Sequence, residues 1–202
     1  MAKKVKGKSK NKTPKKIFRK SWIFPILILT ILFLASLVFD KQILSFAHDI
    51  KEKYGINLGI TFFENNYVLF YGVILVLQVL FIILDKKVKK KKKKIPLLFI
   101  SLLVVEAIVI ALKVVISRQR PQDIFSFSED KSFPSGHTAF AFTALPFLKT
   151  KVWKLVWLII SIIIGLSRLW QGVHYLSDVI VGAVIGYAIP LLILKIANKK
   201  NG

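Results

Sequence analysis

Five segments of about 20 mostly apolar residues constrain the fold of this chain more than any other feature. A helix needs about 20 residues to cross the ~30 Å hydrocarbon core of a bilayer. Of the 202 residues, 54% are hydrophobic, which is high for a soluble domain. The pattern predicts an all-α, multi-pass membrane protein whose spans cover residues 22–39, 67–84, 95–116, 152–169 and 177–197.

A sixth segment, residues 135–149, is apolar over a shorter length and contains Pro146. A helix in this segment would bring the number of crossings to six. We therefore expect six transmembrane helices packed in one bundle over residues 21–197. In the last of them, Gly182 and Gly186 stand one turn apart, and such small residues let a second helix approach closely.

The connection between the first two crossings has a helical periodicity of its own. Apolar residues recur there at helical spacing among charged ones. An amphipathic helix lying in the membrane interface has this pattern. We expect such a helix to bury one apolar face, formed by Ile43, Phe46, Ala47, Ile50 and Tyr54.

Positive charge is distributed unevenly along the chain. The 32 Lys and Arg exceed the 10 Asp and Glu by a net charge of +22, and most form four clusters: before residue 22, in 86–94, in 149–154 and after 194. Six crossings place all four clusters on one side, which the positive-inside rule identifies as the cytoplasm. Residues 1–20, a disordered basic tail, and residues 198–202 would then both be cytoplasmic.

The lysine clusters also bear on partners. Clusters of this kind contact anionic lipid headgroups beside a membrane. Nucleic acid is not expected as a partner, because no aromatic interleaving or known binding fold accompanies the lysines. The sequence leaves the oligomeric state open.

Three polar motifs interrupt the apolar pattern, and the first is Lys113 followed by Arg120 and Pro121. A cation within a membrane span costs a few kcal/mol and is rarely kept without a function. Arg120 follows about two helical turns later, so both cations would project from one face. Pro121 disfavours helical geometry at Arg120, which places the pair near the end of the third span as candidate anion ligands.

The second motif is Pro134-Ser135-Gly136-His137, directly before the shorter apolar segment. Ser135 is a suitable N-cap, and the free amides and positive dipole end of a helix start bind anions. Gly136 would let a ligand approach the backbone closely. His137 could donate a proton to the group bonded to that anion.

The third motif is Ser167-Arg168 with His174 and Asp178 after it. The last two stand four residues apart, on one face where the last helix begins. A hydrogen bond from imidazole to carboxylate would fix the tautomer of His174 and free its other nitrogen as a nucleophile. In the six-crossing topology all three motifs lie at non-cytoplasmic helix ends, where they can form one site.

Together the motifs resemble the three-part signature of the type 2 phosphatidic acid phosphatase superfamily. These are integral-membrane lipid phosphate phosphatases, and the superfamily also includes vanadium haloperoxidases and glucose-6-phosphatase. The resemblance implies a phosphate held by cations, a hydroxyl and a backbone amide: Lys113, Arg120, Arg168, Ser135 and Gly136. It also implies that His137 is the general acid, that His174 attacks phosphorus and that Asp178 orients His174.

The implied reaction has two steps. His174 displaces an alcohol or phosphate to form a phosphohistidine while His137 protonates the leaving oxygen, and water then hydrolyses the intermediate. Fixed cations and amides supply the positive field that a metal provides in other phosphoryl transfers, so we expect no metal and no cofactor. Glu106, deep in the third span, is left outside the catalytic set.

The expected substrate is a lipid phosphate or diphosphate whose tail stays in the membrane. Undecaprenyl or another polyprenyl diphosphate, phosphatidylglycerophosphate and phosphatidic acid all qualify, and the compact chain favours an isoprenoid diphosphate slightly. Two alternatives stay open. One is a vanadate-binding, haloperoxidase-like enzyme, and the other is a non-catalytic membrane protein that only binds anions.

Overall fold

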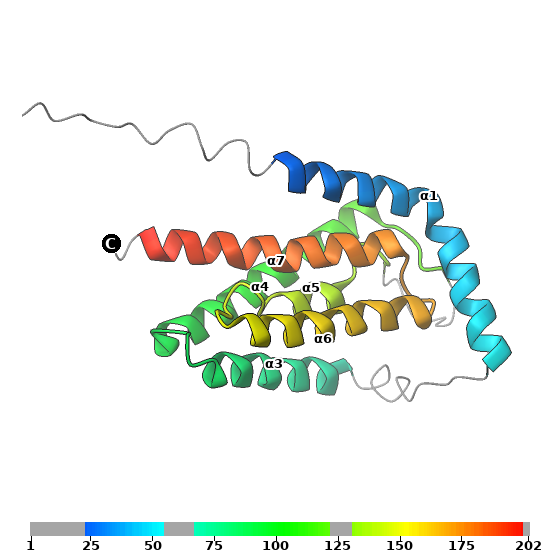
Figure 1. Ribbon diagram of the computed structural model, residues 1–202. Helices are drawn as coiled ribbons and strands as arrows, with labels where there is room; N and C mark the ends of the chain where they lie inside the picture. The colour runs from blue at the N-terminus through cyan, green and yellow to red at the C-terminus, as the bar shows by residue number, and fades with distance from the viewer. Residues whose placement is uncertain (1–22, 55–66, 122–130, 200–202) are drawn as a thin grey trace, which may run out of the picture.

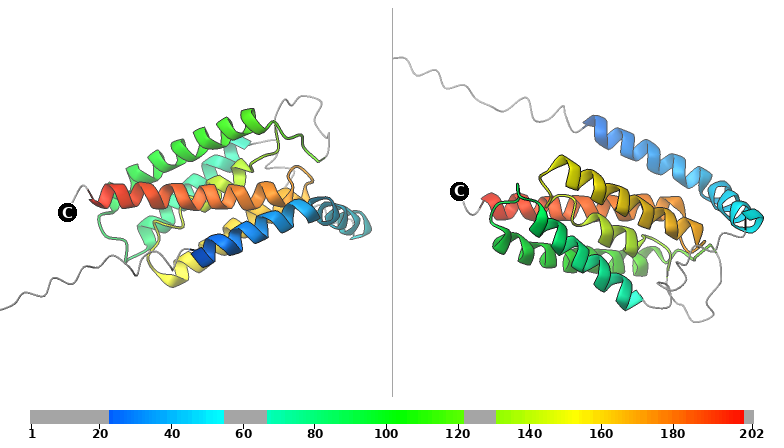
Figure 2. Two further views of the ribbon diagram at one scale, coloured as in Figure 1. Left: turned by 90° about the horizontal axis from the view of Figure 1, so that it is seen from above. Right: turned by 60° about the horizontal axis from the view of Figure 1, so that its bottom comes forward.

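The computed structural model describes residues 23–54, 67–121 and 131–199, and every regular element in this part of the chain is a helix. The helices are α1 (Ile23–Tyr54), α3 (Tyr67–Leu84), α4 (Lys91–Ile116), α5 (Gly136–Phe142), α6 (Lys151–Trp170) and α7 (Leu176–Lys199). Figure 1 and Figure 2 show one bundle in which the short α5 lies among the long helices. The expected all-α class is confirmed for these residues.

Four of these helices are long and apolar enough to cross a membrane: Thr30–Ile50 within α1, and α4, α6 and α7 over their full lengths. In α3 the apolar stretch is shorter, Val68–Leu84. Large apolar side chains on the outer faces are exposed, for example Leu103, Val115 and Ile163, as expected where a helix faces lipid. The protein is a multi-pass membrane protein.

The predicted sixth helix over residues 135–149 is wrong in its length. The helix α5 has only seven residues, about 10 Å at 1.5 Å per residue, and tight turns follow it, such as Leu145 N–H to the carbonyl of Phe142 (3.3 Å). Pro146 is the physical reason, since it has no N–H and disfavours helical geometry at Leu145. The segment nevertheless leads to the opposite end of the bundle, where α6 begins (Figure 1).

Side chains of α3 and α6 complete the C-terminal end of α5. A helix that ends inside a bundle leaves its last carbonyls without partners, which is costly away from water. Gln78 Nε2 donates to the carbonyl of Phe140 at 2.7 Å. Trp157 Nε1 donates to the carbonyl of Ala141 at 2.9 Å, and Ser161 Oγ donates to the same carbonyl at 3.2 Å. These polar contacts allow a short helix to end within a membrane bundle.

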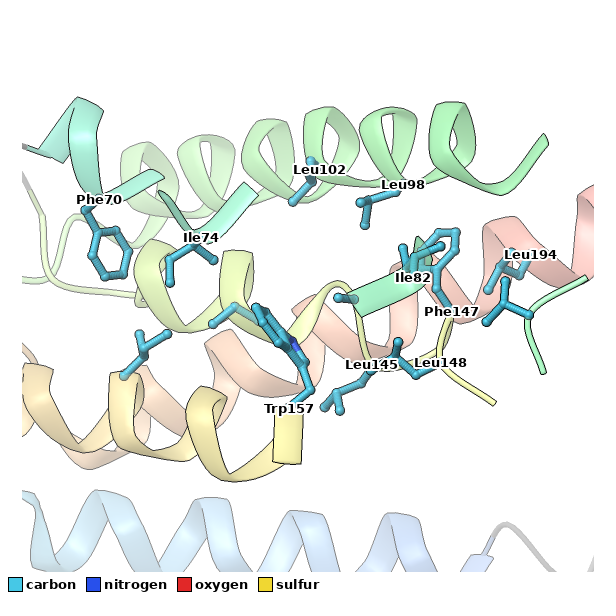
Figure 3. Close-up of a cluster of buried hydrophobic side chains, with 14 residues drawn as sticks. Phe70, Ile74, Ile82, Leu98, Leu102, Leu145, Phe147, Leu148, Trp157 and Leu194 are labelled. Atoms are coloured by element: carbon cyan, nitrogen blue, oxygen red, sulfur yellow. The ribbon is translucent and has the colours of Figure 1, made fainter. Parts of the chain in front are cut away.

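The apolar core lies between α5 and its neighbours and extends along the bundle from Phe70 to Leu194 (Figure 3). Figure 3 shows side chains of α3, α4, α6 and α7 in this core, with Leu145, Phe147 and Leu148 of the turn that follows α5 among them. Trp157, Phe147 and Ile82 are among the largest side chains that are completely buried. This packing fixes the position of α5 relative to the long helices.

A buried carboxylate secures the same end of the bundle. Asp85 follows α3 and accepts hydrogen bonds from the backbone N–H groups of Lys149 (2.7 Å) and Thr150 (2.9 Å), from the Thr150 hydroxyl, and from Lys87 N–H (3.0 Å). Burial raises the pKa of Asp85, but these hydrogen bonds outweigh it and lower that pKa to about 2. The charged carboxylate therefore caps the start of α6 at any physiological pH.

The predicted amphipathic helix is not a separate element. Its described residues continue α1, which runs without interruption from Ile23 to Tyr54 and bends along its length (Figure 1). Neither Gly nor Pro occurs between residues 26 and 54, so nothing in the sequence breaks the helix. Of the expected apolar face, Ile43 and Ala47 are half-buried, whereas Phe46 is 65% exposed.

The helices α5 and α7 approach closely at two glycines, as the spacing of Gly182 and Gly186 predicted. A Cβ atom on Gly182 would lie 2.5 Å from the carbonyl oxygen of Ser135, and one on Gly186 would overlap the backbone carbonyl of Ala139. The backbone of α7 therefore packs directly on α5. This contact fixes the start of α5 relative to the start of α7.

We expect Gly182→Ala to destabilise the protein, because the new methyl group would push the backbone of Ser135 away. Overpacking of this kind costs about 1–3 kcal/mol. Gly72→Ala in α3 is the matched control, since its Cβ would meet nothing within 4 Å and alanine favours a helix over glycine. Thermal unfolding in detergent should give a lower Tm for Gly182→Ala alone, and equal Tm values for the two variants would contradict the close approach.

Candidate active site

The three polar motifs come together at one end of the bundle. The end of α4, the start of α5 and the connection between α6 and α7 all lie there, whereas the α3–α4 and α5–α6 connections lie at the other end (Figure 1, Figure 2). Lys113 and Arg120 are close enough to act electrostatically on the imidazoles of both His137 and His174. Cations and histidines that are up to 61 positions apart in sequence therefore share one site.

The end of α4 positions the first motif. The helix stops at Ile116, and Ser117 adopts a left-handed conformation (φ 50°) while its N–H bonds the carbonyl of Lys113 at 2.9 Å. Lys113 Nζ donates to the carbonyl of Lys131 at 2.5 Å, and Arg120 Nη1 donates to the carbonyl of Val173 at 3.5 Å. Because the chain turns at Ser117, Arg120 lies beyond the helix, near the α6–α7 connection.

Backbone contacts join the second motif to the third. Ser135 occupies the N-cap position of α5, as predicted, but its hydroxyl pairs with that of Thr138 (3.0 Å) rather than with a helix amide. The N–H of Ser135 donates to the backbone carbonyl of Asp178 at 3.0 Å. The start of α5 is thus held against the start of α7.

Aromatic rings of α3 pack against His137. The ring centroid of Phe70 lies 4.7 Å from that of His137, and the centroid of Tyr71 lies 5.0 Å from it. A Cβ on the neighbouring Gly136 would approach the Tyr71 hydroxyl at 3.3 Å and Glu106 Oε1 at 3.9 Å. Glu106, to which the motifs assign no catalytic role, therefore lies next to Gly136.

His174 and Asp178 face each other at the start of α7. Both are buried, with 2% and 0% exposure. His174 Nδ1 lies 3.6 Å from Asp178 Oδ2, an ion-pair distance at which Nδ1 makes no hydrogen bond within the described part of the chain. Burial lowers the pKa of His174; Asp178 raises it, and Arg120 and Lys113 lower it further. The net lowering favours the neutral imidazole that a nucleophile requires.

Arg168 brings a buried cation to the same end. Its side chain is 4% exposed at the end of α6. Its Nε donates to Ser167 Oγ at 3.2 Å, and its Cζ lies 5.8 Å from the ring centroid of Phe70. Its charge acts on His137, so the first and third motifs both contribute cations to the site.

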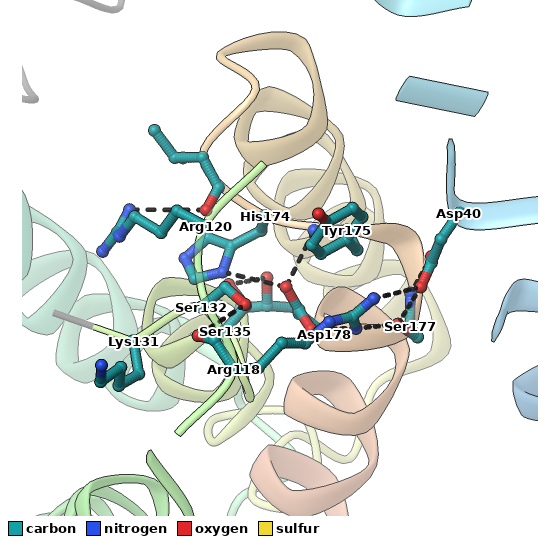
Figure 4. Close-up of polar contacts among 12 residues, drawn as sticks. Asp40, Arg118, Arg120, Lys131, Ser132, Ser135, His174, Tyr175, Ser177 and Asp178 are labelled. Atoms are coloured by element: carbon teal, nitrogen blue, oxygen red, sulfur yellow. Dashed lines mark hydrogen bonds and ion pairs between the residues drawn. The ribbon is translucent and has the colours of Figure 1, made fainter. Parts of the chain in front are cut away.

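Two charged residues that the motif analysis did not single out belong to this cluster. Arg118 bonds Asp178 Oδ1 (2.8 Å) and Asp40 Oδ2 (2.9 Å), so it bridges the carboxylates of α7 and α1 (Figure 4). The positions of both residues in the sequence are compatible with a place at this end of the bundle. Arg118 stands two residues before Arg120, and Asp40 is an acid that directly follows the first apolar segment.

Comparison with protein families identifies the region that carries the site. The model of the PAP2 superfamily matches residues 93–202. All the candidate residues of the three motifs lie in that range. The match covers more than half of the chain.

Comparison with curated proteins finds related segments rather than whole relatives. The chain is 42% identical over 72 residues to a bacitracin transport permease protein, BcrC, of Bacillus licheniformis, covering 35% of this chain and 36% of that protein. It is 40% identical over 82 residues to a probable diacylglycerol pyrophosphate phosphatase of Schizosaccharomyces pombe, covering 32% of this chain and 29% of that protein. It is 44% identical over 73 residues to a probable lipid phosphate phosphatase of Arabidopsis thaliana, covering 28% of this chain and 24% of that protein. The chain thus spans about a third or less of these relatives' lengths.

Two solved structures share the fold. One is a transmembrane PAP2 type phosphatidylglycerolphosphate phosphatase from Bacillus subtilis, with a TM-score of 0.61 and 23% identity, covering 88% of this chain and 96% of that one. The other is LpxE from Aquifex aeolicus, with a TM-score of 0.53 and 30% identity, covering 69% of this chain and 87% of that one. The bundle is therefore the fold of a known class of membrane phosphatases.

Proposed function

Since the chain belongs to the PAP2 superfamily, we propose that it is a lipid phosphatase that hydrolyses a phosphomonoester or diphosphate through a phosphohistidine intermediate. One observation carries the proposal. Three cations, two histidines and a buried carboxylate from separate segments meet at one end of a membrane bundle. A fixed cationic site beside an imidazole is suited to phosphoryl transfer.

In this proposal the cations and the start of α5 bind the phosphate: Lys113, Arg120, Arg168, Ser135 and Gly136. His174 attacks phosphorus through Nε2, because its Nδ1 faces Asp178. Asp178 keeps the proton on Nδ1 and stabilises the imidazolium that forms. His137 protonates the leaving oxygen and then accepts a proton from the water that cleaves the phosphohistidine.

The position of the site supports a lipid substrate. It lies at one end of helices whose outer faces suit lipid, so a lipid can present its phosphate there while its tail stays in the bilayer. The fold neighbour that acts on phosphatidylglycerolphosphate and the curated diacylglycerol pyrophosphate phosphatase are similar proteins with lipid substrates. Polyprenyl diphosphate, phosphatidylglycerophosphate and phosphatidic acid are the substrates that we propose.

Phosphate release from these three lipids by purified protein in detergent is the direct test. We expect turnover on at least one of them. Absence of release from all three would overturn the proposal and favour a protein that only binds anions, a candidate to which the permease name of one relative gives some weight. Peroxide-dependent halide oxidation in place of phosphate release would favour the haloperoxidase-like alternative.

We also propose that the reaction needs no metal ion. The cations and amides at the site supply positive charge directly, and the described residues contain no group of three or more His, Asp or Glu side chains that could hold a metal. Activity should survive EDTA, and vanadate, which adopts the five-coordinate geometry of the transferring phosphoryl group, should inhibit. Loss of activity in EDTA with recovery in Mg²⁺ would refute this mechanism.

The site is proposed to lie on the non-cytoplasmic face. The lysines of residues 86–94 and 149–154, together with Lys195 and Lys199, lie toward the end of the bundle opposite the site. The positive-inside rule assigns that end to the cytoplasm. The lysine clusters would there contact anionic headgroups, and the C-terminus, with the N-terminal tail, would be cytoplasmic.

Thiol labelling tests the orientation cleanly, because the chain has no cysteine of its own. Gln119 and Lys90 are both exposed and lie at opposite ends of α4. Gln119→Cys should react with an impermeant reagent added to intact cells, and Lys90→Cys should react only after lysis. The reverse pattern would place the site in the cytoplasm.

A further inference from the structure

We propose that Arg118 is a positioning residue for the nucleophile: it holds the carboxylate of Asp178 in the orientation that faces His174, and Asp40 of α1 holds Arg118 in turn. The inference rests on the proposed function, since it takes His174 as the nucleophile. Neither Arg118 nor Asp40 is among the residues to which the motifs assign a role. Asp40 also lies outside residues 93–202, which match the superfamily.

The two oxygens of the Asp178 carboxylate have different partners. Oδ1 accepts a hydrogen bond from Arg118 Nη1 at 2.8 Å. Oδ2 accepts one from the N–H of Tyr175 at 2.8 Å and lies 3.6 Å from His174 Nδ1 (Figure 4). The side chain is completely buried, so rotation of the carboxylate would break both hydrogen bonds with no water to replace them. Arg118 thereby helps to hold the plane of the carboxylate so that one oxygen faces His174.

Arg118 is itself fixed by three further contacts. Nη2 donates to Asp40 Oδ2 at 2.9 Å, and Nη1 donates to Ser177 Oγ at 2.6 Å. The guanidinium carbon lies 3.9 Å from the ring centroid of Tyr175, a distance at which the ring face attracts a cation. A planar guanidinium can bridge two carboxylates and stack on a ring at once, whereas the ammonium of lysine is a point charge.

Asp40 links this arrangement to α1. It is 3% exposed, and its Oδ1 accepts the N–H of Ser177 at 3.0 Å while its Oδ2 accepts the Ser177 hydroxyl. Asp40 therefore caps the start of α7 from a different helix. Two buried carboxylates at one helix start would repel each other, and the positive charge of Arg118 between them reduces that repulsion.

The segment that carries Arg118 is also tied down. The N–H of Ser132 donates to the carbonyl of Arg118 at 2.8 Å, and the Ser132 hydroxyl donates to the carbonyl of Gln119 at 3.0 Å. The backbone at Arg118 is thus hydrogen-bonded to the irregular segment that leads into Ser135. The guanidinium of Arg118 therefore connects α1 to α7, and its backbone carbonyl connects to the segment before α5.

The tautomer of His174 is a direct readout that needs no turnover. The full chain has three histidines, so imidazole ¹⁵N NMR in detergent can resolve them. We expect the wild type to carry the proton on Nδ1 of His174 and Arg118→Gln to give a mixture of tautomers. Gln119→Ala, an exposed side chain at the next position, is the control and should match the wild type. A wild-type tautomer in Arg118→Gln overturns the proposal whether or not the protein is a phosphatase.

Kinetics separates positioning from phosphate binding. We expect kcat of Arg118→Gln to fall roughly 10- to 100-fold, as is typical when a residue that orients a functional group is lost, with KM nearly unchanged. In an Asp178→Asn background, adding Arg118→Gln should lower kcat only slightly further, because Arg118 acts through Asp178. A raised KM at unchanged kcat, or losses that multiply in the double variant, would contradict the role.

A folding control keeps the test decisive. Thermal unfolding in detergent shows whether Arg118→Gln retains the bundle. If it does not, Arg118→Lys carries the test, because the charge is kept and only the bridge between the two carboxylates is lost. We then expect mixed tautomers and a reduced kcat in Arg118→Lys, and wild-type values for both would overturn the proposal.

Discussion

We expect His174→Ala to abolish turnover on every lipid phosphate that the wild type hydrolyses. Among the described residues that line the site, His174 is the side chain whose nitrogen can attack phosphorus while a buried carboxylate faces its other nitrogen. His48→Ala is the matched control, since His48 lies on the exposed surface of α1. Near-normal rates in His174→Ala would refute the assignment of the nucleophile.

The same assignment predicts a graded loss at Asp178. Asp178→Asn keeps the shape of the side chain but can present an N–H to His174 and favour the wrong tautomer, a change that lowers kcat on the order of 10⁴-fold in a comparable triad.

Rapid acid-free quenching with a ³²P-labelled substrate should trap labelled wild-type protein and leave His174→Ala unlabelled. Labelling of His174→Ala would place the covalent intermediate elsewhere.

We expect His137→Ala to be impaired in a way that depends on the leaving group. The nucleophile is intact in this variant, but the leaving oxygen has lost its proton donor, which costs roughly 10²- to 10⁴-fold. p-Nitrophenolate leaves without protonation, so the deficit should shrink on p-nitrophenyl phosphate. The measurement is the ratio of variant to wild-type kcat/KM on a lipid phosphate and on p-nitrophenyl phosphate.

Equal impairment of His137→Ala on both substrates would contradict its role as general acid. Such a result would favour a role for His137 in holding the phosphate, which requires a donor regardless of the leaving group. Gln119→Ala and His48→Ala serve as controls for both substrates, because both side chains are exposed. Their rates should match the wild type.

Much of the site could be predicted because its residues carry local signals. A lysine in an apolar helix and a histidine four residues before an aspartate are rare in membrane spans, and a serine before an apolar segment marks a helix start. Alternating topology then assigns Lys113, His137 and His174 to one end of the bundle. The structure places these residues close enough to interact electrostatically.

Local signals also explain the errors. Hydrophobic length predicts a helix over residues 135–149, but Pro146 within it has no N–H and disfavours helical geometry at Leu145. The structure ends α5 at Phe142 and satisfies its carbonyls with Gln78 and Trp157. Those partners are 62 and 16 positions away from the carbonyls that they bond, and no local pattern indicates them.

The sequence by itself determined the all-α class, the membrane setting and the chemical types of the site residues, since these depend on hydrophobic length and short-range spacing. Only the tertiary structure decided how the site is supported. Asp40 and Arg118 are 78 positions apart, and Arg118 and Asp178 are 60 apart. Hydrogen bonds between such residues form only once the helices have packed, so the bridge from α1 to Asp178 exists in the fold and has no counterpart in any single segment.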